Sequence, residues 1–220
     1  IMLKTAKVTP NDLVYDLGSG DGRIAIAAAK DFGARAIGIE FNPEMAALAQ
    51  RNADRSGVGD RVKIINGDIF VEDFSKATVV TMYLLPDLNI SLRPTILKMK
   101  PGTRVTSHAF NTGDWEPDIE IDSPAKAYYW VVPAQVQGEW LISGMEPSRT
   151  TLKLSQHYQK IGGTIQIGND SQPLLNPRLD GSTLSFTYLD RNKSSHFVVL
   201  TVNNNEINGI YKSRSYNDTK

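Results

Sequence analysis

Acidic and glycine residues gather in one short stretch of the chain, where they can bind a small molecule. The stretch contains Asp16, Gly18, Ser19, Gly20, Asp21 and Gly22. Closely spaced glycines let the chain turn sharply and bring bare backbone against a ligand. A dinucleotide-binding loop has a further glycine where this chain has Arg23, and it usually lacks carboxylates such as those of Asp16 and Asp21. The loop therefore favours a ligand that carries positive charge over a pyrophosphate.

Two more acidic groups follow strand-like segments further along the chain. Glu40 ends the segment IGIE and precedes Phe41, and Asp68 precedes Ile69 in the segment GDIF. A carboxylate after the second strand can accept both hydrogen bonds of a ribose diol. Asp68 can accept a hydrogen bond from the amino group of adenine, and Ile69 can pack on the purine face. Together these residues predict a pocket for an adenosine with a cationic, phosphate-free tail, which is the chemistry of S-adenosylmethionine.

Short apolar strands and helices alternate in the part of the chain that must position these residues. We expect strands over residues 13–17, 34–40, 62–65, 78–84 and 103–109, and helices over residues 22–32, 43–57 and 90–99. Asn42 and Pro43 supply the cap and the first residue of the middle helix, whereas Pro94 should bend or end the last one. This alternation predicts an α/β fold with a doubly wound, Rossmann-like sheet that binds ligands at the carboxyl ends of its strands. Residues 119–121 and 127–132 are typical of an antiparallel hairpin that closes the sheet.

The second part of the chain has a different pattern. Strand-like runs separated mostly by Gly, Asn or Asp occur at 138–144, 151–159, 163–168, 183–189, 196–202 and 207–213, and no helical pattern occurs there. The pattern predicts a small all-β antiparallel barrel or meander. We therefore expect two domains, residues 1–134 and residues 135–220.

The composition excludes several classes of function. Lys and Arg total 24 and Asp and Glu total 24, so no net charge attracts nucleic acid or an anionic membrane. Cysteine is absent, which excludes disulfides, thiolate metal sites and cysteine nucleophiles. No apolar run approaches the roughly 20 residues that span a bilayer. Asp87 and Asn89 alone are too few ligands for a metal ion, so we expect no metal.

Four segments resemble a known family. VYDLGSGDGR, IGIE, GDIF and YLLPDL, in this order and spacing, resemble class I S-adenosylmethionine-dependent methyltransferases, and the resemblance covers residues 5–134. Within this class, the glycine loop, IGIE and GD resemble Dot1-like enzymes and the mitochondrial lysine methyltransferases that modify ATP synthase and the adenine nucleotide translocase. The resemblance implies that residues 16–22 hold the methionine portion of the cofactor, Glu40 the ribose diol, and Asp68 with Ile69 the adenine.

The segment after the fourth strand shapes the acceptor site in such enzymes. Those that methylate amide or exocyclic amine nitrogen usually carry Asn/Asp-Pro-Pro-Tyr/Phe there, whereas this chain has YLLPDLN. Tyr83 offers an aromatic wall and a hydroxyl, and Asp87 offers a carboxylate that can orient a lysine amine. We predict these two as the catalytic residues. Among the three histidines, His108 at the end of the fifth strand is the one placed to take part.

The resemblance favours a protein lysine as the methyl acceptor and gives no reason to expect a nucleic acid. Two alternatives stay open, namely a small-molecule methyltransferase whose β domain covers the substrate, and a protein that binds S-adenosylmethionine without turnover. Because the cytoplasm supplies the cofactor, we expect a cytoplasmic protein. Export or membrane anchoring by a segment that precedes Ile1 is the alternative.

Overall fold

The chain folds into two compact units, each with its own core. The computed structural model describes residues 1–142 and 149–212. Its contacts divide the chain into residues 1–132 and residues 133–220. The expected domain boundary after residue 134 lies close to this division.

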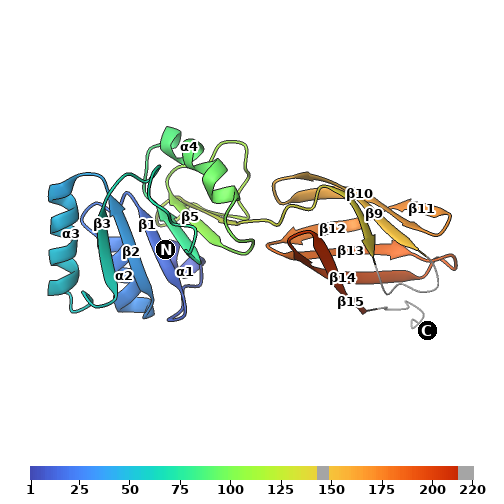
Figure 1. Ribbon diagram of the computed structural model, residues 1–220, viewed down its shortest axis with the longest axis horizontal. Coiled ribbons are helices and arrows are strands. Elements are labelled where there is room, and N and C mark those ends of the chain that lie inside the picture. Colours follow the sequence, from blue (N-terminus) through green and yellow to red (C-terminus); the bar gives the residue numbers. More distant parts are fainter. Residues whose placement is uncertain (143–148, 213–220) are drawn as a thin grey trace. The chain divides into compact units, whose positions relative to one another are not determined.

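The first unit is a seven-stranded sheet with helices packed against it (Figure 1). Its elements in chain order are α1 (Met2–Thr5), β1 (Leu13–Leu17), α2 (Arg23–Phe32), β2 (Arg35–Glu40), α3 (Pro43–Arg55), β3 (Val62–Asn66), β4 (Val79–Met82), α4 (Pro86–Leu97), β5 (Arg104–His108), β6 (Ile119–Ile121) and β7 (Ala127–Val131). The strand order is β3-β2-β1-β4-β5-β7-β6, with β1 to β5 parallel and β7 antiparallel to both β5 and β6. This arrangement confirms the predicted doubly wound sheet and the antiparallel hairpin at its edge.

Local sequence signals set the ends of α2 and α3. The side chain of Asn42 caps α3 by accepting hydrogen bonds from the backbone N–H groups of Glu44 and Met45, at 2.9 and 3.1 Å. Pro43 takes the first helical position, where its missing N–H is not needed. α2 ends at Gly33, which adopts the left-handed conformation that glycine accepts without steric cost. Both helices therefore lie close to their predicted ranges.

One face of the sheet is covered by α1, α2 and α3. Small alanine side chains let α2 and α3 approach the strands closely, and the three helices share a buried cluster with Val14 of β1, Ala36 of β2 and Val79 of β4. α4 lies apart from these helices (Figure 1). Its buried Asn89 donates a hydrogen bond to Ser107 of β5 at 3.0 Å. The parallel strands are thus held so that their carboxyl ends share one edge of the sheet.

The fourth strand and the helix after it differ from the prediction. β4 ends at Met82 rather than at residue 84, and α4 begins at Pro86 rather than at residue 90. Proline fits the first turn of a helix, so Pro86 starts α4. Pro94 lies inside α4 without ending it. It is exposed, so water can bond the carbonyl that it leaves without a donor, while Leu92 and Ile96 anchor the helix by burial.

The second unit consists of two four-stranded antiparallel sheets. Its elements are β8 (Gly138–Ile142), β9 (Thr150–His157), β10 (Lys160–Ile167), β11 (Asp170–Pro173), β12 (Leu175–Asp180), β13 (Thr183–Leu189), β14 (Ser195–Asn203) and β15 (Glu206–Lys212). One sheet has the order β11-β10-β9-β8 and the other β12-β13-β14-β15. Leu152, Ile165, Phe186 and Leu200 belong to one buried cluster that both sheets share. The all-β prediction is confirmed, in the form of two meanders over one core rather than a closed barrel.

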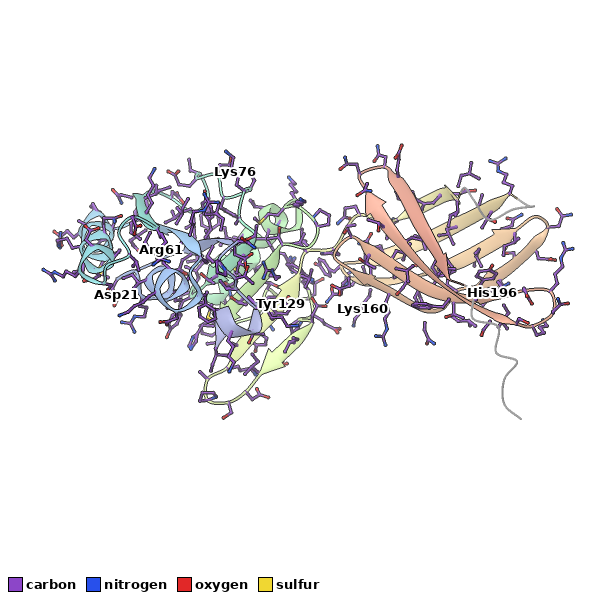
Figure 2. All side chains as sticks on the ribbon, turned by 90° about the horizontal axis from the view of Figure 1, so that it is seen from below. Asp21, Arg61, Lys76, Tyr129, Lys160 and His196 are labelled. Atoms are coloured by element: carbon purple, nitrogen blue, oxygen red, sulfur yellow. The ribbon has the colours of Figure 1, made fainter. Side chains whose placement is uncertain are left out.

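Two strands of this unit, β11 and β12, were not predicted. They contain Pro173 and Pro177, and both lie at the edge of a sheet, where a proline costs no interior hydrogen bond. A histidine of this unit makes structural contacts within it. Nε2 of His196, which is labelled in Figure 2, lies 2.9 Å from Oδ2 of Asp190. The His196 ring stacks on Tyr188 with centroids 5.1 Å apart.

Candidate active site

The glycine loop lies between β1 and α2 and is tied to the end of β2. The backbone N–H groups of Gly18 and Ser19 both donate to the carbonyl oxygen of Ile39, at 2.9 and 3.0 Å. Gly18 has φ +74°, and a Cβ there would come within 2.5 Å of the Leu84 side chain. Any other residue would be strained at this φ, and its Cβ would push the Leu84 side chain aside. The loop is therefore fixed by two neighbouring strands.

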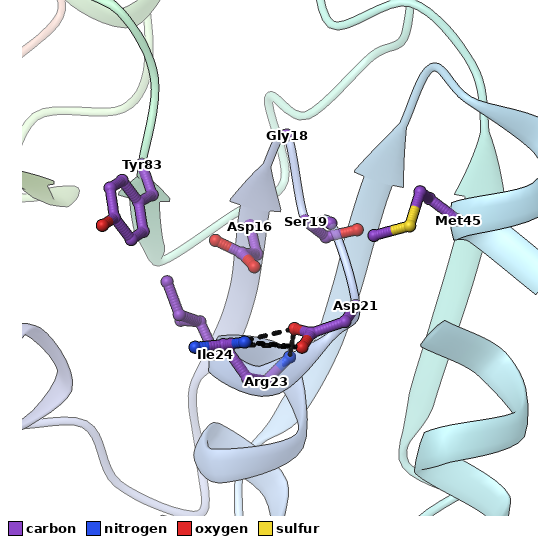
Figure 3. Close-up of a pocket in the computed structure, with 9 residues that line it drawn as sticks. Asp16, Gly18, Ser19, Asp21, Arg23, Ile24, Met45 and Tyr83 are labelled. Carbon is purple, nitrogen blue, oxygen red and sulfur yellow. Dashed lines mark hydrogen bonds and ion pairs between the residues drawn. The ribbon is translucent and has the colours of Figure 1, made fainter. Parts of the chain in front are cut away.

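A pocket of about 330 Å³ opens beside this loop (Figure 3). Its lining residues are Asp16, Gly18, Ser19, Gly20, Asp21, Arg23, Ile24, Met45 and Tyr83. A Cβ at Gly20 would meet no atom within 4 Å, so the backbone here is open to a ligand. In Figure 3 the carboxylate of Asp16 lies between Tyr83 on one side and Met45 on the other. The size falls within the usual range of small-molecule sites.

Asp16 is the most strongly perturbed acid of the pocket. Its side chain is buried at 1% exposure, and Oδ1 accepts a hydrogen bond from Oγ1 of Thr81 at 2.6 Å. Oδ2 is also buried, and no described residue donates to it. Burial raises the pKa of Asp16 to about 7; the hydrogen bond from Thr81 opposes this shift, and the charges of Glu40 and Asp21 add to it. A cationic group beside Oδ2 would favour the ionised carboxylate.

Ser19 and Asp21 supply further polar groups to the loop. Oγ of Ser19 is buried and has no hydrogen-bond partner among the described residues. Asp21 pairs with Arg23 at 2.7 Å, and hydrogen bonds from the Arg23 guanidinium lower the pKa of Asp21. Two unpartnered polar atoms, open glycine backbone and a concentration of carboxylates fit a ligand with cationic and hydrogen-bonding groups. The pocket thus suits the methionine portion of S-adenosylmethionine.

The carboxylate of Glu40 braces the glycine loop. Oε2 accepts from the N–H of Gly20 at 2.8 Å, and Oε1 accepts from the N–H of Asn42 at 2.9 Å. Glu40 does not line the pocket itself. It lies at the end of β2, so it connects the loop with the first turn of α3.

Three other predicted binding residues lie at the same sheet edge but outside the pocket lining. Phe41 follows β2 and is 76% exposed. Asp68 and Ile69 follow β3 and are half-buried, and Oδ1 of Asp68 accepts from the N–H of Phe70 at 2.8 Å. Their place at the carboxyl ends of β2 and β3 is the one predicted, and their contacts with a cofactor stay a prediction.

The two predicted catalytic residues lie in different surroundings. Tyr83 follows β4, lines the pocket and is 56% exposed. Asp87 lies in the first turn of α4, is exposed, and does not line the pocket. The ring of His108, at the end of β5, contacts the Tyr83 ring with centroids 4.1 Å apart.

Comparison with known proteins identifies the class of site. Residues 16–119 match the ANTKMT methyltransferase domain. A protein-lysine N-methyltransferase of Saccharolobus islandicus is 51% identical over 118 residues, which cover 53% of this chain and 73% of that protein. The chain belongs to the ANTKMT methyltransferase family. Its members are class I enzymes that depend on S-adenosylmethionine.

Two further relatives extend the comparison of this ANTKMT-family methyltransferase. A mouse protein, named as a lysine N-methyltransferase of an ATP synthase subunit, is 36% identical over 48% of this chain and 42% of that protein, so the chain spans less than half of its length. A crystal structure described as an RNA methyltransferase from Salinibacter ruber, in complex with S-adenosyl-L-homocysteine, is 44% identical, covers 66% of this chain and 94% of that one, and has a TM-score of 0.60. The comparisons confirm the predicted class and do not show the resemblance to Dot1-like enzymes.

Several pocket residues of this methyltransferase were not predicted from the sequence. Arg23, Ile24 and Met45 line the pocket, and Thr81 holds the buried carboxylate. Met45 lies in the first turn of α3, three residues after the cap Asn42. The predicted start of this helix, directly after the carboxyl end of β2, is the signal that could have found it. Within residues 1–142 and 149–212, no group of three potential metal ligands comes together, and no helix is long and apolar enough to cross a membrane.

Proposed function

We propose that this methyltransferase transfers a methyl group from S-adenosylmethionine to the side-chain amine of a lysine in a protein. The observation that carries the proposal is the pocket in which the unpartnered Oδ2 of Asp16 and the aromatic ring of Tyr83 lie together. The names of the Saccharolobus islandicus and mouse relatives support a lysine acceptor.

The cofactor would be held by carboxylates at the carboxyl ends of β1, β2 and β3. Asp16 and Asp21 face its cationic methionine portion, and Asp68 with Ile69 takes the adenine. Glu40 already accepts two backbone hydrogen bonds, but the two oxygens of a carboxylate offer about four acceptor sites, so capacity for a ribose diol remains. When bound, S-adenosylmethionine supplies a methyl carbon whose bond to sulfur breaks as an aligned nitrogen attacks it.

The charges at the site favour a lysine over a nucleic acid. Arg23, the one basic side chain that lines the described pocket, pairs with Asp21. Asp68 and Asp87, at the same edge of the sheet, have no ion pair within the described ranges. An edge rich in carboxylates attracts a cationic side chain and repels a phosphate backbone.

RNA is the second candidate acceptor, because the name of the Salinibacter ruber structure favours it. On this alternative, Tyr83 would stack on a base, which is a common mode of single-stranded RNA recognition. The carboxylates of the sheet edge argue against it, since each phosphate near them costs Coulomb energy.

One labelling experiment separates these acceptors. The protein is incubated with methyl-labelled S-adenosylmethionine and a cell lysate, with and without prior digestion by ribonuclease or by protease. Label that survives ribonuclease, disappears with protease and is recovered as methyllysine supports the proposal. Label that disappears with ribonuclease supports RNA, and label in small molecules overturns both.

We further propose that the protein acts in the cytoplasm, which supplies the cofactor. Fractionation of cells that express the tagged protein tests this, and recovery in another compartment would contradict it.

A further inference from the structure

His108 lies next to the acceptor side of the pocket without lining it. β4 and β5 are parallel neighbours, and Met82 stands opposite Ser107 in their register. Tyr83 and His108 directly follow these two residues on β4 and β5, and their ring centroids are 4.1 Å apart with planes inclined at 42°. Tyr83 lines the pocket, and His108 contacts the Tyr83 ring. His108 therefore lies beside the part of the pocket where a methyl acceptor would enter.

The imidazole of His108 has an unused nitrogen. Nδ1 is buried, and no described residue forms a hydrogen bond with it. An enclosed polar atom without a partner is unfavourable and needs an explanation in a native structure. A phenyl ring would support Tyr83 equally well without this penalty. Packing therefore does not explain why the residue is a histidine.

The backbone after His108 is strained. Ala109 has φ +63°, a left-handed conformation that is unfavourable for a residue with a Cβ. The N–H of Phe110 donates to the carbonyl oxygen of His108 at 2.7 Å, and the N–H of Ala109 donates to that of Lys126 at 2.9 Å. These two hydrogen bonds hold the strained turn. Such strain persists only where the surrounding structure holds the residue in place.

The buried side-chain amide of Asn89, in α4, holds the same turn by hydrogen bonds. Asn89 is fully buried, and its Nδ2 donates to Oγ of Ser107 at 3.0 Å. The same Nδ2 lies 3.2 Å from the carbonyl oxygen of Phe110 and 3.3 Å from that of Asn111. The residues on both sides of His108 are therefore held by one side chain. These hydrogen bonds fix the position of the imidazole relative to Tyr83.

We propose that His108 contacts the amine that receives the methyl group, with Nε2 accepting a hydrogen bond from one amine N–H. Nδ1 is enclosed, which leaves Nε2 as the nitrogen available to a substrate. Tyr83 forms the adjoining aromatic wall, so the two residues together orient the lone pair of the nitrogen toward the pocket. The assignment rests on the proposed function, because it requires the acceptor to be an amine.

Two substitutions separate this contact from simple packing. His108→Phe keeps an aromatic ring beside Tyr83 but removes both nitrogens, whereas His108→Gln keeps an acceptor near the position of Nε2. We expect His108→Phe to lower the initial rate of protein labelling roughly ten- to a hundred-fold, the equivalent of one hydrogen bond in the transition state. His108→Gln should recover part of the loss. Equal rates for wild type and His108→Phe would overturn the proposal.

Calorimetric titration with S-adenosylhomocysteine and the melting temperature are the controls. The affinity should stay close to wild type in both variants, because His108 does not line the cofactor pocket. The melting temperature of His108→Phe should be at least that of wild type, because the phenyl ring lacks the buried nitrogen without a partner. A His108→Phe protein that loses rate only in proportion to a loss of cofactor affinity would contradict a contact with the acceptor.

A second measurement does not depend on the acceptor being a protein. n-Butylamine, which has the length of a lysine side chain, is titrated into the complex with S-adenosylhomocysteine, and the imidazole signals of His108 are followed by NMR. These signals are identified by their absence from the variant spectra. Saturable shifts support the contact, and unmoved signals overturn it. If wild type labels no protein while the signals shift, the protein-lysine proposal fails and the contact with an amine stands.

Discussion

Oε2 of Glu40 accepts a hydrogen bond from the backbone N–H of Gly20 at 2.8 Å, which joins the end of β2 to the glycine loop that follows β1. The same carboxylate accepts from the N–H of Asn42 through Oε1. One acidic side chain therefore shapes the loop and also lies where a ribose is expected. Replacement of Glu40 removes both contributions.

Glu40→Ala should weaken binding of S-adenosylhomocysteine about ten- to several hundred-fold, since each hydrogen bond to a charged acceptor is worth about 1.5–3 kcal/mol. Calorimetric titration measures the change. Glu40→Gln is the matched control, because it keeps one acceptor oxygen and should lose less affinity. Unchanged affinity in Glu40→Ala would remove this residue from the cofactor site.

The buried Asp16 makes the stability of the free protein depend on pH. Burial raises its pKa from 3.8 to about 7, so the folded protein holds this proton more tightly than the unfolded chain does. The contribution of Asp16 to stability is thus fully present below about pH 4 and is lost as pH rises through about 7, at about 1.4 kcal/mol per pKa unit. Urea unfolding measures the free energy of unfolding of wild type and Asp16→Asn over this pH range. The difference between the two proteins should change with pH. A constant difference would contradict the shifted pKa.

Cofactor binding should depend on pH through the same residue. A cationic ligand beside Oδ2 favours the ionised carboxylate, so binding releases a proton when the pH is below about 7. The Kd for S-adenosylhomocysteine should rise as the pH falls, by up to about tenfold per pH unit. Asp16→Asn should bind weakly and without this dependence. The same pH dependence in both proteins would show that another group titrates.

The acceptor side should respond differently from the cofactor side. Tyr83→Phe and Asp87→Asn should each lower turnover while cofactor affinity stays nearly intact, because they remove interactions made with the acceptor. Asp60→Asn is a suitable control. Asp60 is an exposed carboxylate in the loop before β3, at the amino end of that strand, whereas the site lies at the carboxyl ends of the strands. Wild-type turnover in both variants would leave the segment after β4 as packing alone.

Alanine substitutions at two glycines with the same φ can distinguish the stability cost of a steric contact from that of backbone strain. Gly18 and Gly57 both have φ +74°, but a Cβ at Gly57 meets no atom within 4 Å, whereas one at Gly18 meets the Leu84 side chain at 2.5 Å. Gly57→Ala should cost about 1–2 kcal/mol from the left-handed conformation alone. Gly18→Ala should cost more and should also weaken cofactor binding. Chemical denaturation provides the comparison, and equal losses would show that Leu84 moves aside freely.

Residue patterns in the sequence were enough to predict most elements of the first unit and the acidic residues at its strand ends. Short apolar runs that alternate with helical segments predict the parallel strands, and the pair Asn42-Pro43 predicts where α3 begins. The glycines between Asp16 and Arg23 predict a ligand loop, because closely spaced glycines serve a sharp turn and an approach of bare backbone. These signals are local, so they can be read without knowing how distant segments meet.

Tertiary packing decided what local signals could not. Pro94 stays inside α4 because burial of Leu92 and Ile96 outweighs its missing hydrogen bond, and β11 and β12 tolerate prolines because they are edge strands. The raised pKa of Asp16 comes first from burial of its carboxylate and then from the charges of Glu40 and Asp21, while the hydrogen bond from Thr81 opposes it. The contact between Tyr83 and His108 exists only because β4 and β5 are neighbours. Each of these properties depends on segments far apart in the sequence, and only the folded chain brings them together.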